Sequence, residues 1–299
     1  MSFNKYRRYF TAQRFIRQVA AAIAAVEFLL QIRSISFILV FRKRSIYLYD
    51  NAAREGIDDM KKSLKWVIPV MVVTGLLCAF LVYVGTCFHA DAAAEAALVS
   101  DESVRVMQTE FGWLFDGSSE THALIFYPGG KVEAAAYAPI CRELAQAGVD
   151  VCLVKMPFRL AIFGQDKADE IIDSMDYKHW YIGGHSLGGV IAAIYAAEHP
   201  DSFDGVILLA AYADRPLANE LSTMLIYGTE DGVLNMEKYR ENLSYAPANA
   251  IEHVIEGGNH AQFGSYGVQK GDGEALISPE QQVEETVRVI AGSILEGNR

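Results

Sequence analysis

Apolar and polar positions follow two different patterns along this chain. Residues 67–88 form an uncharged run of 22 residues, whereas short apolar runs from residue 98 onward alternate with segments of mixed polarity. An apolar stretch of ~20 residues has the length of a helix that crosses the hydrocarbon core of a bilayer. We therefore predict a transmembrane helix over residues 67–88 and a separate globular domain after it.

The globular part predicts alternating strands and helices. Short apolar runs predict strands at 104–109, 113–115, 123–127, 149–154, 178–182, 205–211, 224–227 and 251–255. Longer amphipathic segments predict helices at 137–147, 166–175, 190–199, 235–243 and 279–295. The first two strands are expected to pair as a hairpin. Near-continuous apolar strands separated by helices indicate an α/β fold, with a mostly parallel sheet covered by helices on both faces.

The charges beside the predicted span indicate its orientation. Residues 61–65 contain three lysines, and Asp91 and Glu95 follow the span. An excess of positive charge marks the cytoplasmic side, so we expect a single-pass membrane protein with an extracytoplasmic globular domain. The small residues at 90–92 leave cleavage and secretion as an alternative. The apolar run is longer than the ~7–15 residues of a signal peptide core, which favours an uncleaved anchor.

Charge is divided unevenly between the two ends of the chain. Residues 1–66 carry 13 Lys/Arg and 5 Asp/Glu, a net charge of +8, and the remainder carries 13 and 32, a net charge of −19. We therefore divide the chain into a basic N-terminal segment (1–66), the anchor, a short helical stalk (89–97) and the globular domain (98–299). An acidic domain is a poor match for phosphates, so no nucleic-acid partner is expected.

The N-terminal segment allows two interpretations. Residues 19–40 are apolar but are interrupted by Glu27, Gln31 and Arg33. Charges at mid-membrane depth are costly, so an amphipathic helix at the membrane surface is favoured over a second span. The alternative is that translation begins at Met60, in front of the lysines that precede the anchor.

A Gly-x-Ser-x-Gly motif lies at residues 184–188, with Ser186 at its centre. By itself this motif is a weak signal. Here it lies between a predicted strand and a predicted helix, the context in which a strained turn lifts a serine hydroxyl to the end of a sheet. We therefore predict that Ser186 is a nucleophile and that His185 packs locally.

Asp231 and His260 complete a candidate triad. Each follows one of the last two predicted strands, and the carboxyl ends of parallel strands share one edge of a sheet. A serine hydroxyl is a weak nucleophile, so His260 would take its proton, and Asp231 would hold the imidazole in the required tautomer. Glu230 and Asp214 are rivals for the acid. Asp231 is preferred for its position after a glycine turn and in the chain order Ser, Asp, His.

Two backbone N–H groups are expected to stabilise the negative charge that develops on a substrate carbonyl. Leu187 follows the nucleophile and supplies the first. The second would come from the glycine-rich loop after the strand at 123–127, at Gly130 or alternatively Lys131. Removing one such donor typically costs about 2.7–4 kcal/mol of transition-state stabilisation.

The sequence predicts no cofactor and no metal. It contains no phosphate loop, dinucleotide fingerprint or paired-cysteine metal spacing. We interpret Cys78, Cys87, Cys141 and Cys152 as small, buried apolar side chains. A disulfide between Cys141 and Cys152 remains open for an extracellular domain.

The domain at residues 98–299 resembles the α/β-hydrolase superfamily, and within it the branch called alpha/beta hydrolase fold-5, which is dienelactone-hydrolase-like. The matching stretches are residues 126–132, 184–189, 228–232 and 259–264. The resemblance implies the α/β-hydrolase fold and hydrolysis through an acyl-serine intermediate. Dienelactone hydrolases proper use cysteine where this chain has Ser186, so the resemblance does not extend to their substrate.

These observations favour a membrane-anchored serine hydrolase of the carboxylesterase type. The segment at 212–222 is too short for a helical cap, which favours an open site for small or medium acyl compounds. Thioesterase, peptidase and acyltransferase chemistry could use the same triad. A non-catalytic binding or envelope protein is the alternative from another class, because fold alone does not give function.

Overall fold

The computed structural model describes residues 51–119 and 121–296. The surface helix expected at residues 19–40 lies outside them. The chain divides into two compact units, residues 1–76 and 77–299.

The helix α2 (Asn51–Gly85) contains the predicted membrane span. Its stretch Leu64–Tyr83 has a mean hydropathy of 2.3 and is not buried by protein. One helix of this length and composition fits a membrane anchor or a signal sequence. The helix ends at Gly85, so the last three residues of the predicted 67–88 span are not helical. Phe88 instead pairs its backbone with the loop at Val132.

The predicted stalk at residues 89–97 is part of the globular fold. It contains the short helix α3 (Ala92–Ala97), and the Asp91 side chain accepts hydrogen bonds from two backbone N–H groups of its first turn. Ala97 is buried, and its carbonyl accepts a 3.0 Å hydrogen bond from Arg142 Nε. Small alanine side chains allow this close packing, so the helix expected in this segment is present and packs against the domain.

Eight strands form one sheet, in the order β1-β2-β4-β3-β5-β6-β7-β8. The strands are β1 (Arg105–Gln108), β2 (Gly112–Asp116), β3 (His122–Tyr127), β4 (Asp150–Val154), β5 (His179–His185), β6 (Gly205–Leu209), β7 (Ser222–Gly228) and β8 (Ile251–Ile255). The predicted hairpin is β1–β2, and β2 also runs antiparallel to β4. The pairs from β4 through β8 are parallel. This is the α/β-hydrolase arrangement that the sequence predicted.

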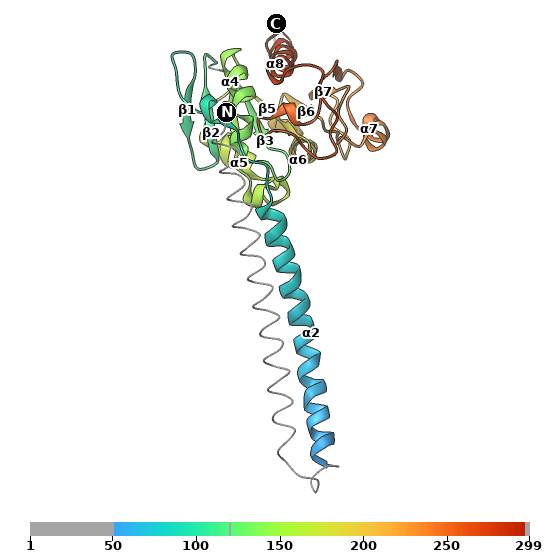
Figure 1. Cartoon of the computed structure of the whole chain (residues 1–299). Coiled ribbons are helices and arrows are strands. Elements are labelled where there is room, and N and C mark those ends of the chain that lie inside the picture. The colour runs from blue at the N-terminus through green and yellow to red at the C-terminus, as the bar shows by residue number, and fades with distance from the viewer. Residues whose placement is uncertain (1–50, 120, 297–299) are drawn as a thin grey trace. The chain divides into compact units, whose positions relative to one another are not determined.

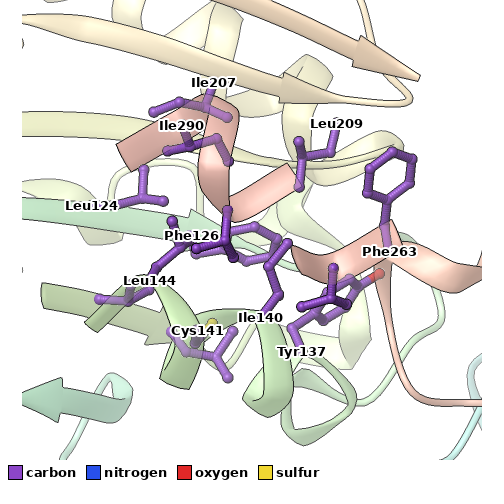
Figure 2. Close-up of a cluster of buried hydrophobic side chains, with 14 of the residues drawn as sticks. Leu124, Phe126, Tyr137, Ile140, Cys141, Leu144, Ile207, Leu209, Phe263 and Ile290 are labelled. Atoms are coloured by element: carbon purple, nitrogen blue, oxygen red, sulfur yellow. The ribbon is translucent and has the colours of Figure 1, made fainter. Parts of the chain in front are cut away.

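Helices cover both faces of the sheet (Figure 1). They are α4 (Ala138–Gln146) and α8 (Pro279–Glu296) on one face, and α5 (Lys167–Ser174), α6 (Leu187–Glu198) and α7 (Met236–Asn242) on the other. Successive residues of a strand point to opposite faces, and both sets are buried here. Leu124 and Phe126 of β3 pack with Leu144 of α4, as Figure 2 shows, while Ile125 packs with Ile191 of α6. The two apolar layers explain the near-continuous apolar strands.

The buried position of Leu144 predicts that the substitution Leu144→Ala strongly lowers the stability of the fold. This side chain is fully buried between α4 and the sheet, so its removal leaves a cavity. We expect a loss of about 2–5 kcal/mol in the free energy of unfolding of the detergent-solubilised chain, measured by chemical denaturation. Leu243→Ala is the matched control, because Leu243 is 41% exposed and should cost much less. Equal losses in the two variants would contradict the assigned packing.

Candidate active site

A sharp turn separates β5 from α6. Ser186 occupies it with φ 53° and ψ −124°, a positive-φ backbone that costs a non-glycine residue about 1–3 kcal/mol. A Cβ on either Gly184 or Gly188 would lie 2.2 Å from the carbonyl oxygen of Tyr127. The two glycines are therefore required for the close approach of β3, the turn and the start of α6. The Ser186 N–H donates to the Leu209 carbonyl at 2.9 Å, which ties the turn to β6.

The structure brings His260 and Asp231 together. The loops after β7 and β8 carry them, and Asp231 Oδ2 lies 2.9 Å from His260 Nδ1. Both side chains are at most 2% exposed. Asp231 Oδ1 accepts hydrogen bonds from the backbone N–H groups of Val233 and Leu234, at 2.9 and 2.8 Å. These hydrogen bonds hold the carboxylate in place, and its other oxygen, Oδ2, faces the imidazole.

The two rival carboxylates lie in other surroundings. Asp214 lies 3.7 Å from Lys238 Nζ and accepts a hydrogen bond from Asn242. Glu230 accepts a hydrogen bond from the neighbouring Thr229 hydroxyl. Of the three candidates for the acid, Asp231 is the one that contacts the His260 ring.

Asp272 holds the loops around this pair and was missed by the sequence analysis. Its Oδ1 accepts from the N–H groups of Gly232 and His260, at 3.1 and 3.2 Å, and its Oδ2 accepts from Ala261 at 2.8 Å. The carboxylate thus joins the loop of Asp231 to the loop of His260. Its position between two glycines was the available signal, but the sequence does not reveal which backbone groups fold over it.

A second buried layer supports the histidine. The Gly129 N–H donates to the Tyr137 hydroxyl at 3.1 Å, and the same hydroxyl is hydrogen-bonded to His185 Nδ1, 2.8 Å away. The His185 and His260 ring centroids are 4.4 Å apart. Burial, and then the charge that His260 can carry, hold the pKa of His185 well below its ordinary value. His185 is therefore a neutral packing partner, and Tyr137 is a contributor that sequence spacing did not reveal.

Gly130 and Leu187 lie next to each other at the turn. A Cβ on Gly130 would lie 3.0 Å from Leu187 Cδ2. The N–H of Lys131, the alternative donor, already donates to the Arg159 carbonyl at 2.8 Å. The Gly129 N–H is engaged with Tyr137. In the loop after β3, Gly130 therefore remains the candidate for the second N–H group that donates to the oxyanion.

Two further features lie apart from the triad residues. Cys87, His89 and Glu133 have ligand atoms within 4.8 Å of one another and could hold a metal ion, although Glu133 also pairs with Arg159 at 3.3 Å. Cys141 and Cys152 are free and buried, so the disulfide left open by the sequence is not formed. The prediction of buried side chains is wrong for Cys78, which is exposed, and for Cys87, which is partly exposed.

A cavity of about 450 Å³ lies beside the loop after β3. Its lining is Trp113, Pro128, Val132, Glu133, Ala134, Ala135, Lys155, Met156, Phe158 and Arg159. These residues combine apolar and charged side chains, and no triad residue is among them.

A family model described as the alpha/beta hydrolase family matches residues 123–284, more than half of the chain. The chain belongs to the alpha/beta hydrolase family. The chain is 27% identical over 108 residues to a serine hydrolase-like protein from Danio rerio. The match covers 35% of this chain and 32% of that relative, so the chain spans about a third of its length.

Solved structures with a similar fold include a dienelactone hydrolase from Anabaena variabilis. It is 15% identical, with a TM-score of 0.48, and the match covers 64% of this chain and 99% of the dienelactone hydrolase. A carboxylesterase from Bacillus subtilis is 11% identical, with a TM-score of 0.47, and the match covers 67% and 95% of the two chains.

The supporting layer predicts the effect of Tyr137→Phe. Loss of the hydroxyl leaves the buried Gly129 N–H and His185 Nδ1 without their partner. We expect about 1–3 kcal/mol lower stability in chemical denaturation. Tyr227→Phe serves as the control, since its partly exposed hydroxyl makes only a 3.3 Å contact with Glu252. Wild-type stability of the Tyr137 variant would show that this hydroxyl does not support the site.

Proposed function

We propose that this chain is a membrane-anchored serine hydrolase that works through an acyl-serine intermediate. The observation that carries the proposal is the buried Asp231–His260 pair, at the sheet edge where Ser186 ends β5 in a strained turn. Membership of the hydrolase family and the serine hydrolase-like relative support this chemistry. The apolar helix Leu64–Tyr83 supports the anchor, and the three lysines at its N-terminal end (residues 61–65) support an extracytoplasmic catalytic domain.

Each proposed catalytic group has one chemical task. Neutral His260 takes the hydroxyl proton as Ser186 attacks the substrate carbonyl, and Asp231 stabilises the imidazolium that results. The N–H groups of Leu187 and Gly130 donate to the oxyanion of the tetrahedral intermediate. The imidazolium then protonates the leaving group, and water, activated by the same imidazole, releases the acyl group from Ser186.

Labelling with a fluorescent fluorophosphonate tests the nucleophile. The full chain in detergent should be labelled, because an activated serine hydroxyl attacks phosphorus. Ser186→Ala should abolish the labelling. A folded wild-type chain that is not labelled would contradict the proposal and favour a non-catalytic binding protein.

Two matched aspartate variants extend this test to the acid. Asp231→Asn should slow labelling by up to about 10⁴-fold, because the amide no longer holds the required tautomer. Asp214→Asn should label at the wild-type rate, since Asp214 contacts Lys238 and Asn242 instead of the histidine. The reverse order would assign the acid to Asp214.

The proposed substrates are small or medium acyl compounds, with carboxylic esters as the simplest class. Only residues 210–221 separate β6 from β7, which is too short a segment for a helical cap. A series of esters of one alcohol with increasing acyl length should give the highest kcat/KM for short or medium chains. Equal or better turnover of long-chain esters would overturn this assignment.

A further inference from the structure

The loop between β4 and α5 presents large apolar side chains to the outside. It consists of the short helical turns η2 (Pro157–Arg159) and η3 (Ala161–Phe163). Phe158, Ile162 and Phe163 are 48–53% exposed. Phe158 and Arg159 both have positive φ, 52° and 58°. Consecutive left-handed non-glycine residues persist only where the surroundings impose them, and such strain is concentrated at functional loops.

The apolar helix contacts this loop within the compact unit of residues 77–299. The Phe80 ring packs edge-on against the rings of Phe158 and Phe163, with centroids 5.6 and 6.4 Å away. Phe80 lies three residues inside the end of the apolar stretch at Tyr83, which is about 4.5 Å of helix at 1.5 Å per residue. If the stretch crosses a bilayer, these rings lie at the depth where aromatic side chains gather.

A basic residue of the loop after β3, Lys131, lies at the same end of the apolar helix. Lys131 Nζ lies 4.3 Å from the centroid of the Tyr83 ring and donates to the Thr86 hydroxyl at 3.0 Å. Lysine at the end of an apolar helix, next to a tyrosine, is typical of the boundary between hydrocarbon and headgroups. The aromatic residues of the helix and of the loop at residues 157–163, together with Lys131, are thus the residue types found where a protein meets one membrane surface.

Two residues of the exposed loop, Arg159 and Leu160, lie beside the segment that carries Gly130. The Arg159 carbonyl accepts the Lys131 N–H at 2.8 Å, and Leu160 Cδ2 lies 3.8 Å from the Cβ position of Gly130. Met156 and Phe158 line the cavity of about 450 Å³, with Arg159 at their side. This lining combines apolar side chains with charged ones, so it suits an amphiphilic ligand that has both an apolar and a polar part.

We propose that the loop at residues 157–163 rests in the membrane surface and that the substrate reaches Ser186 from the bilayer. The substrate class is then an amphiphilic acyl ester dissolved in the membrane, with its reacting carbonyl at Gly130 and Leu187 and its remaining part along the cavity. This inference rests on the proposed hydrolase activity for the chemistry, and on the loop contacts for the location.

The test compares one acyl group on two alcohols, using the full chain in phosphatidylcholine vesicles. One fluorogenic ester is water-soluble, and the other carries a lipid chain that keeps it in the vesicles. Ile162→Ser combined with Phe163→Ser should lower turnover of the vesicle-bound ester about tenfold, the effect of weakening two apolar contacts with the bilayer. Turnover of the soluble ester should change less than about twofold.

Leu243→Ser is the matched control. Leu243 is 41% exposed and follows α7, which comes after β7, whereas the loop follows β4 at a distant position in the sheet. This variant should leave both activities unchanged. Equal loss of both activities in the loop variant, or loss of neither, would overturn the proposal.

Fluorescence quenching locates the loop independently of activity. Phe163→Trp should add tryptophan emission that brominated lipids quench, above the signal of the three native tryptophans, whereas Leu243→Trp should add unquenched emission. An unquenched Trp at position 163 would contradict the membrane contact. A wild-type chain that hydrolyses neither ester would refute the proposed hydrolase, while quenching would still decide where the loop lies.

Discussion

The left-handed turn at Ser186 is the constraint on which the candidate site depends. It exists because Gly184 and Gly188 let the backbone come close to the Tyr127 carbonyl, where any Cβ would collide. Parallel pairing of β5 with β3 and β6 on its two sides holds the turn at the edge of the sheet. Two layers of apolar packing stabilise that sheet, and their burial provides the free energy that a strained turn costs.

Around the turn, buried polar groups form hydrogen bonds with one another, although His185 Nε2 has no partner among the residues that the structure describes. Asp231 accepts two backbone N–H groups and faces His260, while Asp272 joins the loops that carry both residues. Tyr137 and His185 form a second layer behind the imidazole. Buried polar groups are costly unless they have partners, so this network fixes the loop positions as well as the chemistry.

Local pattern predicted the parts of this molecule that depend on neighbouring residues. The apolar runs of β3 and β6 gave the sheet, and the strand–turn–helix context singled out Ser186. Contacts between distant segments were not predictable in the same way. Composition indicated the helix at Ala92–Ala97, but not the hydrogen bond from Arg142 that holds it against the domain.

The supporting residues escaped prediction for the same reason. Tyr137 opens a predicted helix, and nothing in its neighbourhood indicates that its hydroxyl meets His185 48 positions later. The loop at residues 157–163 carries no regular period, and its relation to Gly130 arises from the folded sheet. Such side chains become recognisable only when the segments that they join are placed in space.

A structure of the chain after reaction with a phosphonate inhibitor tests the central claim most directly, because the adduct imitates the tetrahedral intermediate. The proposed mechanism predicts phosphorus bonded to Ser186 Oγ, with a phosphoryl oxygen about 2.7–3.1 Å from the backbone nitrogens of Leu187 and Gly130. It also predicts His260 within hydrogen-bond reach of the adduct. An adduct on another residue, or a phosphoryl oxygen directed away from both nitrogens, would contradict it.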